Sequence, residues 1–410
     1  MKSKNKVFYE YLFLFDTYQR RKYDMKKVVS VLLVLAMAVA CLAGCGGSGN
    51  NEEKADAFYI GGIGPTTGDA AIYGNAVKNG AQIAIDEINE AGGINGVKIE
   101  YNFQDAQADP EKAINAYNTL KDWGMQISMG TVTTDACVAV AAQTATDNMY
   151  MLTPSASSVD VIAQDNAFQV CFTDPNQGYA SARYIGENAL ATKVAIISDS
   201  STVYSSGIRA TFVEEAKNQN FEVVADEFFT ADSKTDFQTQ LQKAKDAGAE
   251  LVFLPIYYQE ASIILKQADT MGYDPLFFGC DGMDGILTLE NFDTSLAEGL
   301  MLLTPFSADS EDAATKSFVE KYKEAYGETP NQFAADAYDV IYTMKAAIEK
   351  AGVTPDMDAS AICDAMVAVM PEITVQGITG GADGLTWAAT GEVTKEPKAV
   401  VIENGVYVGM

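Results

Sequence analysis

Short, uninterrupted apolar runs separated by segments of helical period constrain this fold more than any other feature of the sequence. Residues 194–197 (VAII) and 251–254 (LVFL) are apolar at every position, which is typical of strands covered on both faces in a parallel sheet. Between such runs, apolar residues recur every three or four positions, as they do from Val77 to Ile88. Repeated strand–helix alternation of this kind predicts an α/β fold with doubly wound, Rossmann-like sheets.

The chain is long enough for two such sheets. It has 410 residues, and compact domains usually hold about 100–150 residues. The alternation is interrupted near residues 172–175 and again near 303–305, and we interpret these stretches as crossings between two lobes. The strands predicted from apolar runs are 58–63, 97–103, 126–129, 149–152, 194–198, 221–228, 251–254 and 275–278.

Composition argues against several classes of function. The formal net charge is −28, so nucleic acid is not expected as a partner, because phosphate binding needs clustered Lys and Arg. The chain contains no histidine, which excludes Ser-His-Asp and Cys-His catalysis and histidine-bearing metal sites. The glycine-rich residues 61–68 fit no dinucleotide motif, and no Walker A run or G-x-S-x-G elbow is found. We therefore expect neither an enzyme nor a bound cofactor.

The six cysteines do not form a metal or redox motif, because no two of them stand in a CxxC pair. Four of them lie in the body of the chain, namely Cys137, Cys171, Cys280 and Cys363. They are far apart in sequence, so we expect small buried apolar residues rather than a disulfide framework, and no metal site.

The N-terminal segment has the order of an export signal. Lys26 and Lys27 precede an apolar run over residues 28–43, which is short for a membrane-spanning helix and ends in small residues. The sequence Leu-Ala-Gly-Cys that ends at Cys45 resembles the bacterial lipoprotein box, in which the cysteine is lipidated. We expect a signal over residues 1–44, with Met25 as an alternative start, and a flexible tether over 45–56. The alternative is a secreted protein without an anchor.

Several motifs of the body resemble one family when they are taken in order. The sequence resembles the leucine/isoleucine/valine-binding proteins of ABC importers, which have the type I periplasmic binding protein fold. The matching stretches are 63–68 (IGPTTG), 73–74 (YG), 91–96 (AGGING), 105–110 (DAQADP), 130–134 (GTVTT) and 152–157 (LTPSAS). The resemblance runs from about Phe58 to the C-terminus.

The resemblance implies two lobes joined by a three-segment hinge. The first would hold residues 57–173 and 306–376, and the second residues 175–304 and 378–410. It also implies a monomer, anchored by lipid alone to the outer face of a bacterial membrane, that hands an amino acid to permease and ATPase subunits.

Candidate binding residues lie in loops after predicted strands, where open parallel sheets bind ligands. Thr133 and Thr134 stand at the start of the predicted helical segment 134–147, and a helix N-terminus favours a carboxylate. Ser155 and Ser157 follow the next strand. Without the resemblance, each of these hydroxyls is equally a capping or turn group.

The resemblance assigns roles within an amino acid site. Thr134, Ser155 and Ser157 match positions that bind the ligand carboxylate. Asp281 matches the carboxylate that receives the ligand ammonium, although the family pattern has glutamate there. The tyrosines match residues that line the cleft, with Tyr257 favoured over its neighbour. The predicted site is Tyr73, Thr133, Thr134, Ser155, Ala156, Ser157, Tyr204, Tyr257 and Asp281.

Two alternatives remain at this point. The chain is a transport protein for another ligand, such as an amide, urea or an aromatic acid, or it is a ligand-binding module of a receptor. The hydroxyls of Thr134, Ser155 and Ser157, together with a carboxylate at Asp281, favour an amino acid, because an ammonium group needs acceptors and a carboxylate needs donors.

Overall fold

The computed structural model describes residues 56–410. The predicted export signal, Cys45 and most of the predicted tether lie outside the described residues. No helix within residues 56–410 combines the length and the apolar character that crossing a membrane requires.

The first sheet has five strands in the order β2-β1-β3-β4-β5, and all of its neighbours are parallel. Strand β1 is almost entirely buried, as its apolar sequence predicts. It pairs with β2 from Ala57 opposite Lys98 to Gly64 opposite Asp105. The strands are β1 (Ala57–Gly64), β2 (Lys98–Asp105), β3 (Ile127–Met129), β4 (Met151–Thr153) and β5 (Ala167–Gln169).

The second sheet has seven strands in the order β14-β13-β10-β9-β8-β6-β7. Strands β6 to β10 are parallel, whereas β13 runs antiparallel to β10 and pairs with β14 as a hairpin. The strands are β6 (Lys193–Asp199), β7 (Glu222–Phe229), β8 (Leu251–Leu254), β9 (Leu276–Gly279), β10 (Met301–Thr304), β13 (Lys398–Glu403) and β14 (Val406–Gly409). A small third sheet pairs β11 (Thr374–Val375) with β12 (Leu385–Thr386).

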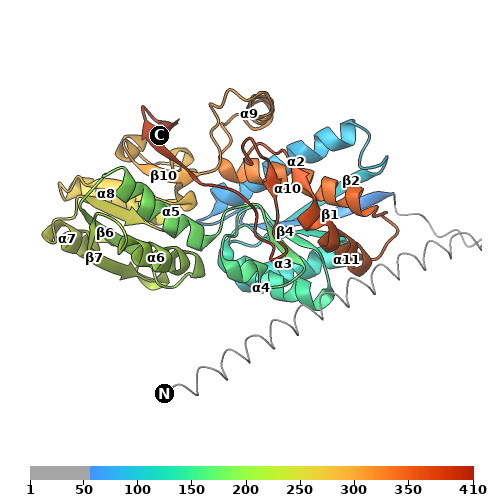
Figure 1. The fold of residues 1–410 in the computed structure, drawn as a ribbon, viewed down its shortest axis with the longest axis horizontal. Coiled ribbons are helices and arrows are strands. Elements are labelled where there is room, and N and C mark those ends of the chain that lie inside the picture. The colour runs from blue at the N-terminus through green and yellow to red at the C-terminus, as the bar shows by residue number, and fades with distance from the viewer. Residues whose placement is uncertain (1–55) are drawn as a thin grey trace, which may run out of the picture. The chain divides into compact units, whose positions relative to one another are not determined.

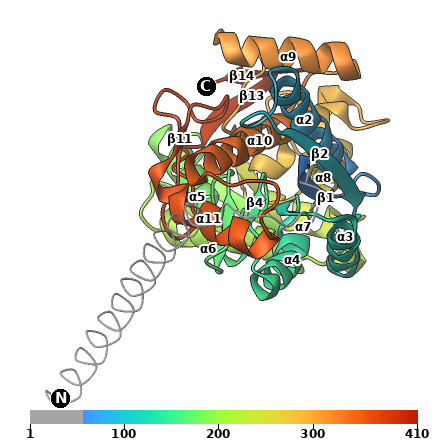
Figure 2. The same ribbon diagram turned by 90° about the vertical axis from the view of Figure 1, so that its right-hand side faces the viewer.

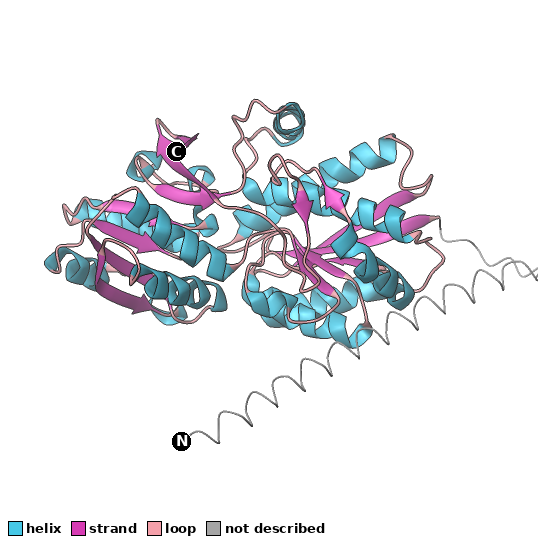
Figure 3. Cartoon of the chain, viewed as in Figure 1, coloured by secondary structure: helices cyan, strands magenta, loops and turns pink. Residues whose placement is uncertain are grey.

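Helices cover both faces of the two larger sheets (Figures 1 and 3). Their bounds are α2 (Ala71–Glu90), α3 (Pro110–Trp123), α4 (Thr134–Asp147), α5 (Asp174–Glu187), α6 (Val203–Ala216), α7 (Gln238–Asp246), α8 (Tyr258–Thr270), α9 (Ala313–Tyr326), α10 (Gln332–Ala351) and α11 (Ala359–Val369). Short 3₁₀ turns are η1 (Val159–Ile162), η2 (Ala231–Ser233), η3 (Asp281–Met283), η4 (Ile286–Thr288), η5 (Thr294–Ala297) and η6 (Met370–Glu372).

The helices divide between the sheets by their contacts. Helices α2 and α3 pack on β1, α11 packs on β3 and α10 packs along α2, whereas α6 and α7 pack on β6 and β7. Figure 2 shows α3 beside α4 and α9 beside α2. We call the five-stranded sheet with its helices the first lobe, and the seven-stranded sheet with its helices the second lobe.

A glycine sets the close approach of α2 and α10 in the first lobe. A Cβ atom added to Gly80 would stand 2.0 Å from the carbonyl oxygen of Ala334 on α10, a distance that no side chain could accept. The apolar faces of both helices are buried between them and the sheet. Helix α10 is therefore held firmly to the first lobe.

The predicted α/β class with doubly wound parallel sheets is confirmed, and every predicted strand overlaps an observed one. The strands that were not predicted are β5, β10, β11, β12, β13 and β14. The chain leaves the first sheet after β5, returns to α10 after β10, and crosses again to β13. The residue boundaries given above for the lobes stay a prediction.

Candidate functional site

A small cavity lies where the loops of the two lobes meet. It receives residues from the carboxyl ends of strands β3, β4, β8 and β9 and from helices α2, α6 and α10. Its free volume is about 10 Å³, enough for about one water molecule, so its walls stand close together. The lining residues are Tyr73, Val132, Thr133, Thr134, Ser155, Tyr204, Tyr257, Asp281, Gly282 and Phe333.

Hydroxyl and amide donors form the first-lobe wall of this cavity. Helix α4 begins here, with Thr133 as its N-cap residue in extended conformation. The hydroxyl of Thr133 is buried and has no hydrogen-bond partner among the described residues. The hydroxyl of Thr134 accepts a bond from the Ser157 N–H at 3.3 Å, and Ser155 Oγ donates to the Val132 carbonyl at 2.7 Å. Free donors and the positive end of a helix favour a carboxylate here.

A buried carboxylate forms the opposite, second-lobe wall. Asp281 follows β9 and is 4% exposed. Its Oδ1 atom accepts a bond from the Tyr204 hydroxyl at 2.6 Å, and its N–H donates to Gln177 Oε1 at 3.1 Å. Burial raises the pKa of Asp281 to about 6, against the lowering effect of the hydrogen bond from Tyr204. A cation beside this group would favour its ionised form.

Aromatic rings close the remaining sides of the cavity. The Tyr73 ring lies 4.4 Å from Phe333 and 5.4 Å from Tyr257 between centroids, and Tyr257 lies 4.8 Å from Tyr204. The Tyr73 hydroxyl donates to the Gly282 carbonyl at 2.5 Å and so joins the lobes. Burial raises the pKa of Tyr73 well above its usual value, so its ring stays neutral. An apolar ligand side chain would find contact area here.

Comparison with known proteins identifies the family of this chain. A family model described as "Periplasmic binding protein" matches residues 57–396, most of the chain. The chain belongs to the periplasmic binding protein family. As a periplasmic binding protein, it is extracytoplasmic and a solute-binding protein by family.

Relatives of this periplasmic binding protein are named for branched-chain amino acids. It is 31% identical to the Leu/Ile/Val-binding protein homolog 3 of Brucella melitensis, over 82% of this chain and 88% of that one. It is 28% identical to a Pseudomonas aeruginosa protein named for leucine, isoleucine, valine, threonine and alanine, over 78% and 84%. The structure is also similar to the crystal structure of LivJ from Streptococcus pneumoniae in complex with isoleucine, with a TM-score of 0.77 and 30% sequence identity. The match covers 86% of this chain and 100% of the LivJ chain.

Two of the residues predicted for the site do not line the cavity of this periplasmic binding protein. Ser157 turns its hydroxyl to Asp174 Oδ1, at 2.6 Å, and is fully buried. Ala156 lies behind Ser155, where its N–H donates to the Thr153 hydroxyl at 3.1 Å. The Ser157 N–H donates to the Thr134 hydroxyl at 3.3 Å, so Ser157 supports a lining residue without lining the cavity itself. The other seven predicted residues do line the cavity.

Three lining residues were not predicted. Val132 lies one position before the predicted threonine pair, within a stretch already matched to the family. Gly282 follows Asp281, and a Cβ atom there would stand 2.7 Å from the Tyr204 hydroxyl. Phe333 lies in the second residue of α10, far from the others in sequence. No local sequence pattern distinguishes Phe333 from an ordinary core residue, so only the folded structure shows that it lines the cavity.

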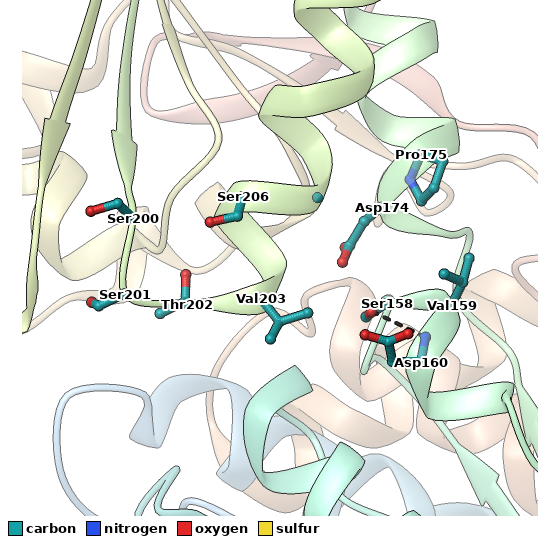
Figure 4. A pocket seen from close by; sticks show the side chains of 11 residues that line it. Ser158, Val159, Asp160, Asp174, Pro175, Ser200, Ser201, Thr202, Val203 and Ser206 are labelled. Carbon is teal, nitrogen blue, oxygen red and sulfur yellow. Dashed lines mark hydrogen bonds between the residues drawn. The ribbon is translucent and has the colours of Figure 1, made fainter.

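A second, larger cleft lies near the crossing from β5 to α5 (Figure 4). Its volume is about 490 Å³, and serine and threonine hydroxyls line much of it. Asp174 points into the space between α5 and α6 in Figure 4, and its Oδ2 atom is buried without a hydrogen-bond partner among the described residues. None of the nine residues predicted for the site lines this cleft.

The described residues offer no group of three or more acidic or cysteine side chains that could hold a metal ion. Cys137, Cys171, Cys280 and Cys363 are all buried and unpaired in this part of the chain, as predicted for small apolar residues. Burial raises the pKa of each of these thiols, which makes them poor nucleophiles.

Proposed function

We propose that this chain captures an amino acid between its two lobes and delivers it to an ABC importer. The observation that carries the proposal is one cavity with donor hydroxyls on one wall and a buried carboxylate on the other. An amino acid zwitterion needs both, because each buried charge must be hydrogen-bonded or paired. The branched-chain amino acids named for the relatives, and the isoleucine of the LivJ structure, support the same ligand class.

Each end of the ligand has its own wall in this proposal. The carboxylate lies at the start of α4, where Thr133 and Thr134 donate hydrogen bonds with the backbone N–H groups of the helix end. The ammonium group lies against Asp281, whose pKa falls as the ion pair forms. The side chain lies against Phe333 and Val132, and no lysine or arginine lines the cavity, which disfavours acidic amino acids.

Closure of the lobes couples binding to recognition by the transporter. The cavity in its present form has room for about one water molecule, so entry of an amino acid requires the lobes to separate. We place the hinge at the predicted boundaries, near residues 174, 305 and 377. A ligand that contacts both lobes favours the closed form by its differential affinity for that form.

The anchor and the partners complete the proposal. Lipidation at Cys45 holds the protein to the outer face of the membrane as a monomer, and the predicted flexible tether over residues 45–56 gives it reach. The permease and ATPase subunits of the importer receive the closed form.

Calorimetric titration of purified, ligand-stripped protein against the twenty amino acids tests this function. Leucine, isoleucine and valine are expected to bind more tightly than glutamate or lysine. Two analogues of leucine test the two walls of the cavity one at a time. 4-Methylpentanoate lacks the ammonium group, and 3-methylbutylamine lacks the carboxylate. Both are expected to bind at least a hundredfold more weakly, because each leaves one wall without its partner. Equal affinity for either analogue would contradict the zwitterion proposal.

A further inference from the structure

The loop that carries Asp281 is held by residues from both lobes. Gln177 lies on α5, which packs along α6 of the second lobe, and Tyr204 lies on α6. They bond the N–H and the carboxylate of Asp281, respectively. These two contacts lie within the lobe that carries Asp281. A third contact comes from the first lobe, through Gln332.

Gln332 is the first residue of α10 and makes two bonds to this loop. Its side-chain Nε2 donates to the Asp281 carbonyl at 2.9 Å, and its backbone N–H donates to Asp284 Oδ2 at 2.8 Å. Gln332 is 2% exposed and Asp284 is 4% exposed. The donor must be the amide nitrogen, because a carbonyl oxygen can only accept.

The two bonds cross between the lobes. Helix α10 is fixed to the first lobe by its close packing on α2, where Gly80 allows contact with Ala334. Asp281 follows β9 of the second sheet. Tyr73 of α2 makes a parallel contact, to the Gly282 carbonyl. Separation of the lobes therefore breaks the contacts of Gln332 and Tyr73 and leaves those of Gln177 intact.

We propose that Gln332 is a positioning residue that fixes the Asp281 loop only when the lobes are closed. Its amide fixes the Asp281 carbonyl and its backbone N–H fixes Asp284, so that the Asp281 carboxylate is aimed into the cavity as the ligand is enclosed. Asp284 also acts on α10, because a carboxylate near a helix N-terminus stabilises the free N–H groups there. This inference rests on the proposed function, since it concerns the same site.

Gln332→Glu changes one donor into an acceptor with little change of shape. At pH 8 the new carboxylate faces the Asp281 carbonyl, and both groups can only accept hydrogen bonds, so we expect the dissociation constant for leucine to rise at least tenfold. Below its pKa, the introduced carboxyl carries a proton and donates again. The ratio of variant to wild-type dissociation constants is therefore expected to fall toward one between pH 8 and pH 5.

Dividing the dissociation constant of the variant by that of wild type cancels the effect of other groups near this loop that titrate in both proteins. Burial raises the pKa of Asp281, Asp284 and Asp336 to about 6 and that of Tyr407 well above its usual value. These groups titrate in wild type as well, and Lys395 pairs with Asp336 in both proteins. A purely structural role for Gln332 would leave a ratio that does not change with pH.

Two further variants complete the experiment. Gln332→Ala removes the donor without adding charge, so a three- to tenfold loss of affinity that does not recover at low pH is expected for one hydrogen bond. Gln242→Glu adds the same charge at an exposed position of α7 and is expected to match wild type.

The outcomes separate this inference from the proposed function. If wild type binds none of the amino acids, the proposed function fails. If wild type binds leucine and Gln332→Glu binds it equally at pH 8, or if its ratio is constant with pH, the role of Gln332 is wrong. If Gln332→Glu does not fold by circular dichroism, the alanine variant decides, and affinity within twofold of wild type overturns the inference.

Discussion

Replacement of Asp281 by Asn is the most informative single change, because it removes the proposed partner of the ligand ammonium and preserves the shape of the site. The amide oxygen of asparagine still accepts a bond from the Tyr204 hydroxyl, which lies 2.6 Å from Asp281 Oδ1. The neighbouring bond from the Asp281 N–H to Gln177 is a backbone contact and is retained.

The expected loss follows from the burial of this carboxylate. Asp281 is 4% exposed, and removal of one partner of a buried charge pair typically costs about 3–5 kcal/mol. That range corresponds to an affinity roughly a few hundredfold to a few thousandfold weaker. Calorimetry with leucine measures the loss, and Asp274→Asn, an exposed carboxylate just before β9, is the matched control.

The pH dependence gives a second reading of the same change. Burial raises the pKa of Asp281 to about 6, whereas the ligand ammonium favours the ionised form and lowers the pKa in the complex. Binding therefore releases a proton below about pH 6, and wild-type affinity falls as the pH is lowered through this range. Asp281→Asn lacks this proton release. A variant that binds leucine within threefold of wild type, or that keeps the same proton release, would refute the role of Asp281.

Three further predictions concern space, charge and anchoring. Gly282→Ala puts a Cβ atom 2.7 Å from a cavity hydroxyl and is expected to weaken leucine binding at least tenfold by calorimetry, whereas Gly409→Ala, with open space around it, is expected to change nothing. In wild type, Lys395 Nζ lies 2.6 Å from Asp336 Oδ1, and Lys395→Met leaves this carboxylate as an uncompensated buried charge. Urea unfolding is expected to show that the free energy of unfolding falls by about 3–5 kcal/mol. A fall under about 1 kcal/mol would contradict this expectation. Cys45→Ser is expected to move the protein from the membrane fraction to the soluble fraction, and continued sedimentation with membranes would disprove lipidation.

Most of the central strands could be predicted from the sequence alone. Runs such as 194–197 and 251–254 are apolar at every position because both faces are covered by helices, and this local property leaves a clear pattern. One strand that was not predicted owes its place in the sheet to a distant partner. Strand β13 pairs with β10, which lies about a hundred residues earlier in the sequence. The six residues of β13 carry no local pattern that predicts this pairing.

Some residues of the candidate site could likewise be predicted from the sequence, and others could not. Thr134 and Asp281 lie in the loops that follow β3 and β9, so the rule that ligands bind at the carboxyl ends of strands locates them. Ser157 stands in an equivalent place, yet its hydroxyl turns to Asp174, because the buried carboxylate at the lobe crossing needs a donor. Phe333 and Gln332 begin a helix whose position against the other lobe depends on the whole fold.

A crystal structure of the protein with L-leucine tests binding between the lobes. We expect the ligand to lie between them, with its carboxylate within hydrogen-bond distance of the start of α4 at Thr134 and its ammonium group beside Asp281. A ligand bound in another cleft, or one whose ammonium group faces away from Asp281, would show that the proposed site is wrong.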